Sequence, residues 1–161
     1  ALIERLDWWE GHAAANGATL DNNPSPGNIA GGITTILEKS LGAVAKAGSS
    51  SLRAVVDYAA PIPVQGFNFM DSPGYDPCSA TGQIASGANL IAFTTGRGSV
   101  FGSKPAPTLK LASNSDLARR MADDIDVDCG RLLTGEATLE QLGEEVFAAM
   151  LEIASGKRTK S

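Results

Sequence analysis

Several features that would point to a particular class of protein are scarce in this chain of 161 residues. It has only two cysteines, Cys78 and Cys129, which lack Cys-x-x-Cys spacing and are too few for a disulfide scaffold. The single histidine, His12, has no acidic or cysteine residue three or four positions away, where it would share a helix face. We therefore expect a surface or packing histidine, and Ser-His-Asp chemistry is not indicated.

Long apolar runs and surplus positive charge are also missing. No run approaches the ~20 apolar residues needed to cross a bilayer, and the first ten residues carry charges within an amphipathic segment, so neither a membrane span nor a signal peptide is expected. The net charge of -5 argues against nucleic-acid binding, because phosphate neutralisation needs surplus Lys and Arg. With so few cysteines, a reducing cytoplasm is the expected location.

Glycine is abundant, at 18 residues, and the glycines cluster in polar stretches, which predicts tight turns that approach a ligand closely. The hydrophobic spacing predicts a single α/β domain over 1–161, layered, with a mainly parallel sheet flanked by helices in a Rossmann-like arrangement. The expected helices are 2–16, 29–46, 51–59, 80–88, 115–121 and one beginning after a capping box at Thr138 and Gln141; the expected strands are 18–20, 66–74, 89–95 and 107–114.

The stretch 21–28 reads DNNPSPGN and has two prolines that bracket a serine. Proline fixes its own φ and favours an extended residue before it, so we expect no helix here. We expect a rigid polar rim for a ligand, with Asn28 capping the helix that follows. The alternative is an elaborate helix cap with no ligand.

Polar, glycine-bearing segments follow the expected strands at 71–82, 94–99 and 112–115. In open parallel sheets, ligands bind outside the carboxyl ends of the strands, so these segments predict a ligand site. The segment TTGRGS offers backbone N–H groups and Arg97 to a carboxylate or phosphate, or it is a simple turn. Ser79 and Thr81 near a helix start suit an anion, or they act only as caps.

The acidic residues have less specific interpretations. Asp71 and Asp76 flank a proline-glycine turn, where Asp is often only a turn former. The acidic stretch 123–128 is expected to be a solvated helix end, because it lacks EF-hand spacing. The basic tail from Lys157 onward is expected to be frayed.

Three long motifs resemble one family, the altronate and galactarate dehydratases, in its carboxyl-terminal part. They are NPSPGNIAGGITTILEKSLGAVAKAG, FMDSPGYDPCSATGQIASGANLIAFTTGRGSVFG and PTLKLASNS. The resemblance covers nearly the whole chain and is closest to the altronate type. It implies a carboxyl-terminal part of a longer hydro-lyase that converts a sugar acid to a 2-keto-3-deoxy acid. The alternatives are galactarate dehydratase, the large subunit of sulfolactate sulfo-lyase, or a non-catalytic binding or assembly domain.

The resemblance also implies partners and site residues. The expected partners are a sugar-acid substrate, the rest of the same polypeptide and a further copy in a homo-oligomer. The expected cofactor is a divalent metal, ferrous iron, with its main ligands outside this segment; Asp71, with Asp76, is the carboxylate candidate for completing the metal shell. Arg97 and Lys104 are candidates for holding the substrate carboxylate. The other substrate-binding candidates are Asp21, Asn22, Asn23, Ser25, Asn28, Ser79 and Thr81. The catalytic candidates are Asp76 and Lys39. Lys39 is a base if burial lowers its pKa, or else it is part of an ordinary salt bridge.

Overall fold

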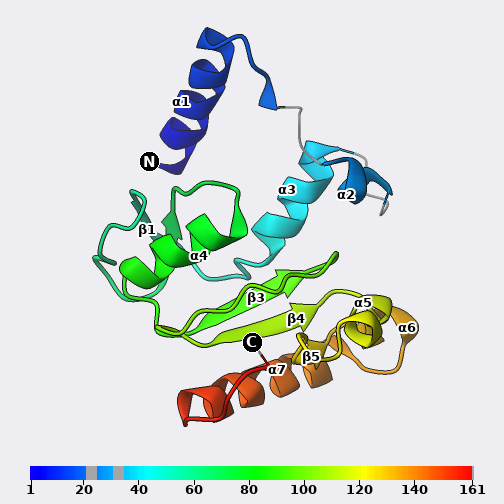
Figure 1. Ribbon diagram of the computed structural model, residues 1–161. Coiled ribbons are helices and arrows are strands. Elements are labelled where there is room, and N and C mark those ends of the chain that lie inside the picture. Colours follow the sequence, from blue (N-terminus) through cyan, green and yellow to red (C-terminus); the bar gives the residue numbers. More distant parts are fainter. Residues whose placement is uncertain (21–24, 31–34, 161) are drawn as a thin grey trace. The chain divides into compact units, whose positions relative to one another are not determined.

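The computed structural model describes residues 1–20, 25–30 and 35–160 (Figure 1). Its contacts divide the chain into two compact units, Ala1–Asp71 and Ser72–Ser161, and each is described by itself. All strand pairs in the described residues are parallel, which confirms the layered α/β class with parallel sheets. The Rossmann-like arrangement and the single domain stay predictions.

The first unit contains three described helices and a two-stranded parallel sheet. Its elements are α1 (Leu2–Ala15), α2 (Pro26–Ala30), α3 (Ile36–Ala45), β1 (Leu52–Val56) and β2 (Phe67–Met70). The first helix is confirmed and ends at Ala15, with Asn16 as its C-cap, followed by Gly17 with a φ of 66°. The strand predicted at 18–20 is wrong. The helix predicted at 51–59 is also wrong, because Val55 and Val56 pair with β2 and such β-branched residues suit a strand.

The proline-rich stretch contains a short helix that the sequence did not predict. Pro26 is the first residue of α2, where its missing N–H costs no hydrogen bond. The carbonyl of Ser25 accepts hydrogen bonds from the N–H groups of Asn28 and Ile29, at 2.9 and 3.0 Å. Asn28 is therefore inside a helix. This corrects the expectation that the stretch contains no helix and the expectation that Asn28 caps the helix that follows.

The helix predicted over 29–46 is divided. A new helix, α3, begins at Ile36 because Thr35 has extended backbone angles and its hydroxyl accepts a hydrogen bond from the Glu38 N–H at 3.2 Å. Residues 21–24 and 31–34, which include the predicted site residues Asp21, Asn22 and Asn23, lie outside the described residues.

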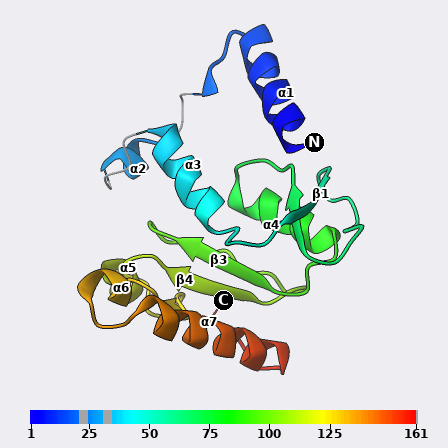
Figure 2. The same cartoon turned by 180° about the vertical axis from the view of Figure 1, so that it is seen from behind.

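The second unit contains a parallel sheet in the order β3-β4-β5 (Figures 1 and 2). Its elements are α4 (Asp76–Ala85), β3 (Ile91–Thr95), β4 (Thr108–Ala112), α5 (Ser115–Arg120), β5 (Val127–Asp128), α6 (Arg131–Thr134) and α7 (Leu139–Ala154). The strands expected at 66–74, 89–95 and 107–114 are confirmed as β2, β3 and β4. The helices expected at 80–88 and 115–121 are confirmed as α4 and α5, and the side chain of Asn114 caps α5. The prediction that the acidic stretch 123–128 is a helix end is wrong, because α5 ends at Arg120 and the stretch contains β5.

The central strand β4 is buried along its whole length, so both of its faces are covered. Leu109 and Leu111 form a core cluster with Val127 and with Ile153 of α7, which runs along one face of the sheet (Figure 2). The capping box that begins α7 is confirmed. The Thr138 hydroxyl accepts a hydrogen bond from the Gln141 N–H at 3.2 Å, and the Thr138 N–H donates to Gln141 Oε1 at 2.8 Å.

One fully buried side chain of β4 is charged. Lys110 is 0% exposed; its Nζ donates a hydrogen bond to the Ser99 carbonyl at 2.9 Å and lies 3.6 Å from Asp124 Oδ1. A buried ammonium is costly unless it is paired and hydrogen-bonded, and both conditions hold here. Lys110 therefore ties the segment after β3 and the acidic segment before β5 to the centre of the sheet. Among the described residues, no helix is long and apolar enough to cross a membrane.

Candidate functional site

The carboxyl ends of the three strands in the second unit meet at one edge of the sheet. The register sets Thr95, the last residue of β3, opposite Ala112, and sets Ala112 opposite Asp128, the last residue of β5. The segments that follow, 96–98, 113–115 and 129–130, therefore leave the sheet side by side. We call these three segments, together with Thr95 and Asp128, the strand exits. Of the three segments expected to follow strands of one sheet, 94–99 and 112–115 meet at this edge, whereas 71–82 follows β2, which pairs with β1 in a separate sheet.

One backbone hydrogen bond joins the first two exits, and a second hydrogen bond closes the turn of the first exit. The Thr95 carbonyl accepts from the Ser113 N–H at 3.0 Å, and its hydroxyl accepts from the Gly98 N–H at 3.0 Å. A Cβ on Gly98, whose φ is 107°, would lie 2.2 Å from the sulfur of Met121. The TTGRGS segment therefore needs glycine here for both its backbone angle and its packing.

Asn114 is held by both ends of its side-chain amide. Its Oδ1 accepts a hydrogen bond from the Leu117 N–H at 2.9 Å, and its Nδ2 donates to the Gly96 carbonyl at 3.0 Å. Next to it, the hydroxyl of Ser113 would lie 3.1 Å from a Cβ on Gly96. The amide thus fixes the spacing between the first two exits before any ligand binds, which is the preorganisation that a binding site requires.

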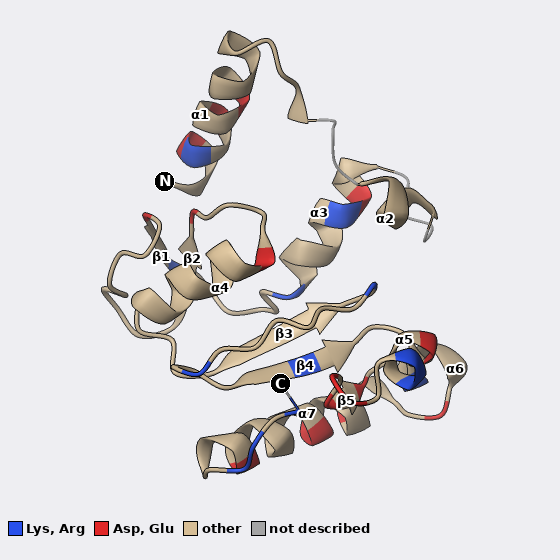
Figure 3. Cartoon of the chain, viewed as in Figure 1, with Lys and Arg blue, Asp and Glu red and all other residues tan. Residues whose placement is uncertain are grey.

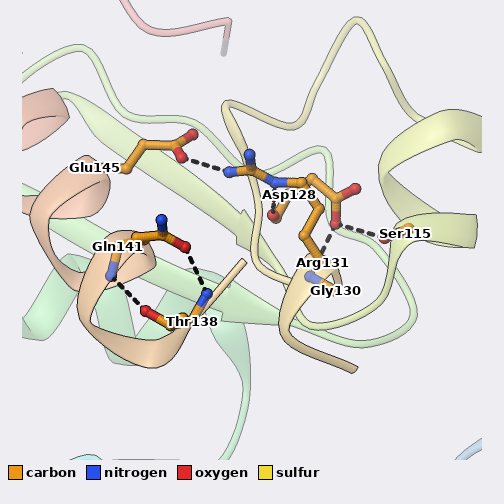
Figure 4. Close-up of polar contacts among 7 residues, drawn as sticks. All are labelled: Ser115, Asp128, Gly130, Arg131, Thr138, Gln141 and Glu145. Carbon is orange, nitrogen blue, oxygen red and sulfur yellow. Dashed lines mark hydrogen bonds and ion pairs between the residues drawn. The ribbon is translucent and has the colours of Figure 1, made fainter. Parts of the chain in front are cut away.

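Asp128 joins the second and third exits (Figure 4). Its Oδ1 accepts hydrogen bonds from the Ser115 hydroxyl at 3.1 Å and from the Gly130 N–H at 2.8 Å. A Cβ on Gly130 would lie 2.1 Å from the backbone nitrogen of Ser115, so only glycine fits there. Arg131 donates to the Asp128 carbonyl at 3.0 Å and forms an ion pair with Glu145.

The charges around the third exit determine the protonation of two groups. Burial raises the pKa of the Cys129 thiol, and the negative charges of Glu145 and Asp128 raise it further, against the opposing effect of Arg131. The thiol therefore stays protonated and is a poor nucleophile at neutral pH. The hydrogen bond to Glu145 raises the pKa of Arg131, which keeps its full charge.

The residues predicted from the sequence are distributed over both units. Asp76, Ser79 and Thr81 lie in α4, Arg97 in the exit after β3, Lys104 in the segment before β4, Ser25 before α2, Asn28 in α2, Lys39 in α3 and Asp71 after β2. Among the members of this set that belong to the second unit, Arg97 lies at the strand exits. Lys39 is exposed in the described part of the chain, and its role as a base stays a prediction. Ser79 shares a hydrogen bond with Ser72 at 3.1 Å between their hydroxyl oxygens. A common site for the whole set stays a prediction.

The described residues do not form a metal centre. Within 1–20, 25–30 and 35–160, no three His, Cys, Asp or Glu side chains come together in a way that could hold a metal ion. Asp71, the expected carboxylate ligand, instead accepts a hydrogen bond from the Trp9 indole at 3.0 Å and lies 3.9 Å from the Arg5 guanidinium. The described part of the chain therefore does not fit a divalent metal by itself.

Sequence reasoning missed Asp128 and Gly130 at the third exit. The signal was present in the alternation of Ile125 and Val127 with aspartates, which suits a short strand, followed by Cys-Gly as a tight exit. The acidic composition of the stretch obscured this pattern. Taken together, the strand exits offer amide, hydroxyl, backbone and guanidinium groups, which suit a ligand with hydroxyl groups and a carboxylate.

Comparison with known proteins agrees with this chemistry. The sequence matches the family described as D-galactarate/Altronate dehydratase, C-terminal, over residues 1–161. The chain belongs to this family. As a member of the D-galactarate/altronate dehydratase family, it is 39% identical to the altronate dehydratase of Escherichia coli over 158 residues and 36% identical to the galactarate dehydratase (L-threo-forming) of the same organism over 157 residues. Each match covers 98% of this chain.

A third similar protein is named as a sulfo-lyase and not as a dehydratase. The chain is 36% identical over 142 residues to the (2R)-sulfolactate sulfo-lyase subunit beta of Chromohalobacter salexigens, a match that covers 88% of the chain. The chain spans about a third of the length of these curated relatives, with 30%, 32% and 36% of their residues matched. The matches therefore show that the chain belongs to the family, and they concern one part of a longer enzyme in each relative.

Proposed function

We propose that the intact protein containing this chain is a hydro-lyase that removes water from a sugar acid, with altronate as the first candidate, and gives a 2-keto-3-deoxy acid. The observation that carries the proposal is the family match over all 161 residues, together with two dehydratase relatives at 36% and 39% identity. The strand exits are the proposed wall of the substrate site.

The reaction is a β-elimination with three chemical requirements. A base removes the proton from C2, next to the carboxylate, and the enediolate that forms needs stabilising. An acid then protonates the departing C3 hydroxyl, so the C3–O bond breaks and an enol forms, which tautomerises to the 2-keto acid. The chain's own contribution in this proposal is binding and orientation.

Arg97 supplies the charge for the substrate carboxylate, since a guanidinium binds a carboxylate through two parallel hydrogen bonds. Its backbone is held in place because its carbonyl accepts a hydrogen bond from Arg120 at 3.0 Å. Ser113 follows β4 on the same edge and its hydroxyl is suited to a substrate hydroxyl group, while Asn114 holds the first two exits at their spacing. A wall fixed by hydrogen bonds in this way positions the substrate at little entropic cost.

We further propose that the remaining groups come from parts of the polypeptide outside this chain. A divalent metal such as ferrous iron has no ligand set among the described residues, so we assign no step through it and place its main ligands outside. The relatives' greater length supports a site completed elsewhere in the polypeptide. A cytoplasmic location and a homo-oligomer stay predictions.

A second candidate reaction is the elimination of sulfite from a sulfolactate-type substrate, in which a C–S bond breaks in place of the C–O bond. The observation that favours it is the 36% identity to the sulfo-lyase subunit.

A substrate panel on the intact protein, with added ferrous iron, tests both. Altronate, other hexonates, galactarate and sulfolactate are supplied in turn, and formation of the keto acid or release of sulfite is followed. We expect the highest turnover with altronate. Turnover of galactarate alone would move the reaction to the other dehydratase type, and sulfite release would favour the second candidate. No turnover of any of them would leave a binding or assembly role and overturn the proposal.

A further inference from the structure

A groove of about 960 Å³ lies at the other end of the second unit's sheet from the strand exits. One wall is the segment before β4, from Val100 to Pro107, and the other is the end of α7 with the tail that follows it, to Thr159. Pro107 directly precedes the first residue of β4, so the groove is at the amino end of the strand. It is therefore separate from the carboxyl edge at which Arg97 lies.

The wall formed by the tail is held in place, contrary to the expectation that this basic segment is frayed. The Lys160 N–H donates a hydrogen bond to Asp126 Oδ1 at 2.9 Å, and the Lys160 ammonium donates to the Ala122 carbonyl at 2.8 Å. At the helix end, the Lys157 N–H donates to the Glu152 carbonyl at 3.0 Å. The tail is thus fixed at both ends and presents its side chains in a defined position.

The charged side chains that line the groove are mostly cationic. They are Lys104, Lys157 and Arg158, with Asp124 as the one acid (Figure 3 shows blue segments both in the tail after α7 and before β4). This local excess of positive charge stands out in a chain with a net charge of -5. Such a concentration of one sign in a concave surface raises the local concentration of oppositely charged ligands.

Pairing decides how much of that positive charge is available. Asp124 lies 3.6 Å from the ammonium of the fully buried Lys110, so its negative charge is compensated from within the sheet. Lys157 is paired with Glu152 at 2.6 Å. Lys104 and Arg158 have no carboxylate within 4 Å in the part of the chain that the structure describes, and they stand on opposite walls.

We propose that this groove is a second binding site, for a small organic anion that carries at least two negatively charged oxygen groups. Lys104 binds one group and Arg158 binds the other, the latter through the two parallel hydrogen bonds that a guanidinium makes with a carboxylate or phosphate. The ligand bridges the segment before β4 and the tail. The site does not depend on the proposed dehydration, because it lies at the opposite end of the strands.

The test is isothermal titration calorimetry of the intact protein with two probes, citrate and pyrophosphate, at one fixed low ionic strength. We expect at least one probe to bind, and the double variant Lys104→Ala with Arg158→Ala to raise its Kd by about tenfold or more. The matched control is Lys46→Ala, which removes an exposed positive charge from the first unit and should leave the Kd unchanged. Both groove residues are exposed, so the double variant should keep its fold, and a thermal melt checks this.

Two results would overturn the proposal. One is that neither probe binds at about 10 mM; the other is that the control weakens binding as much as the double variant, which would mean diffuse attraction only. Tighter binding of citrate assigns a carboxylate ligand, and tighter binding of pyrophosphate assigns a phosphate ligand; both support the site. The single variant Arg158→Lys, which keeps the charge and loses the fork of donors, should lie between wild type and the double variant.

Discussion

Replacing Lys110 by methionine removes the buried charge at the centre of β4 and keeps most of the apolar stem. The half-buried Ser99 carbonyl then loses its donor, which costs free energy toward the lower end of the about 1–3 kcal/mol for a buried polar group. Asp124 loses its cation, but its side chain is 33% exposed and regains water, so the cost falls below the about 3–5 kcal/mol of a fully buried broken pair. We therefore expect the free energy of unfolding to fall by about 2–4 kcal/mol.

The assay is urea unfolding followed by far-ultraviolet circular dichroism, because both tryptophans lie in the first unit and would not report on β4. Lys46→Met is the matched control, an exposed lysine with the same change, and should stay within about 0.5 kcal/mol of wild type. A cycle with Asp124→Asn isolates the pair, and we expect a coupling energy of about 1–3 kcal/mol. A loss below about 1 kcal/mol for Lys110→Met would refute the reasoning, since the buried charge would then contribute almost nothing.

Three further predictions follow from single contacts. Thr138→Ala removes the capping box of α7 and should lower the free energy of unfolding in urea by about 1 kcal/mol, whereas an unchanged midpoint would contradict the role of the cap. Gly130→Ala places a Cβ against the backbone of Ser115 and should lower the free energy of unfolding by about 3 kcal/mol or more. The control Gly143→Ala adds a Cβ in open space on α7 and should raise the free energy of unfolding by about 0.5–1 kcal/mol. Equal effects of the two variants would argue against the close approach at Gly130. The pKa of the Cys129 thiol is raised in the folded state, so the protonated thiol favours the folded state. Its contribution to stability is fully present below the pKa of the unfolded chain and is lost as the pH rises from that pKa toward the folded one. Wild type should therefore lose stability as the pH rises above about 8.5, where unfolded thiols titrate, more steeply than Cys129→Ala, and parallel profiles would contradict this.

The carboxyl edge of the sheet was predictable from the sequence because its strands carry their own signals. The segments that became β3 and β4 are apolar and rich in strand formers, and each is followed directly by glycine, serine or asparagine. Parallel pairing then brings these exits together without further information. For the same reason the capping box of α7 was visible, since Thr138 and Gln141 are only three residues apart.

What the sequence did not reveal depends on partners that are distant along the chain. The two residues of β5 are too few to predict a strand with certainty from the alternation around them, and pairing with β4 is what makes them one. The segment 51–59 is compatible with a helix until β2 pairs with it. Lys110 alternates with Leu109 and Leu111 as if it faced water, and only the return of the chain at Ser99 and Asp124 buries it. Burial of a charge of this kind is decided by tertiary contacts.

The most direct test of the proposed substrate wall is the kcat/KM of the intact Arg97→Ala variant with the best substrate from the panel. Lys46→Ala, which removes a positive charge far from the strand exits in sequence, serves as the control. If the exits bind the sugar-acid carboxylate, kcat/KM should fall by about tenfold to a hundredfold for Arg97→Ala and stay unchanged for the control. A value for Arg97→Ala within about twofold of wild type would contradict a substrate site at this edge of the sheet.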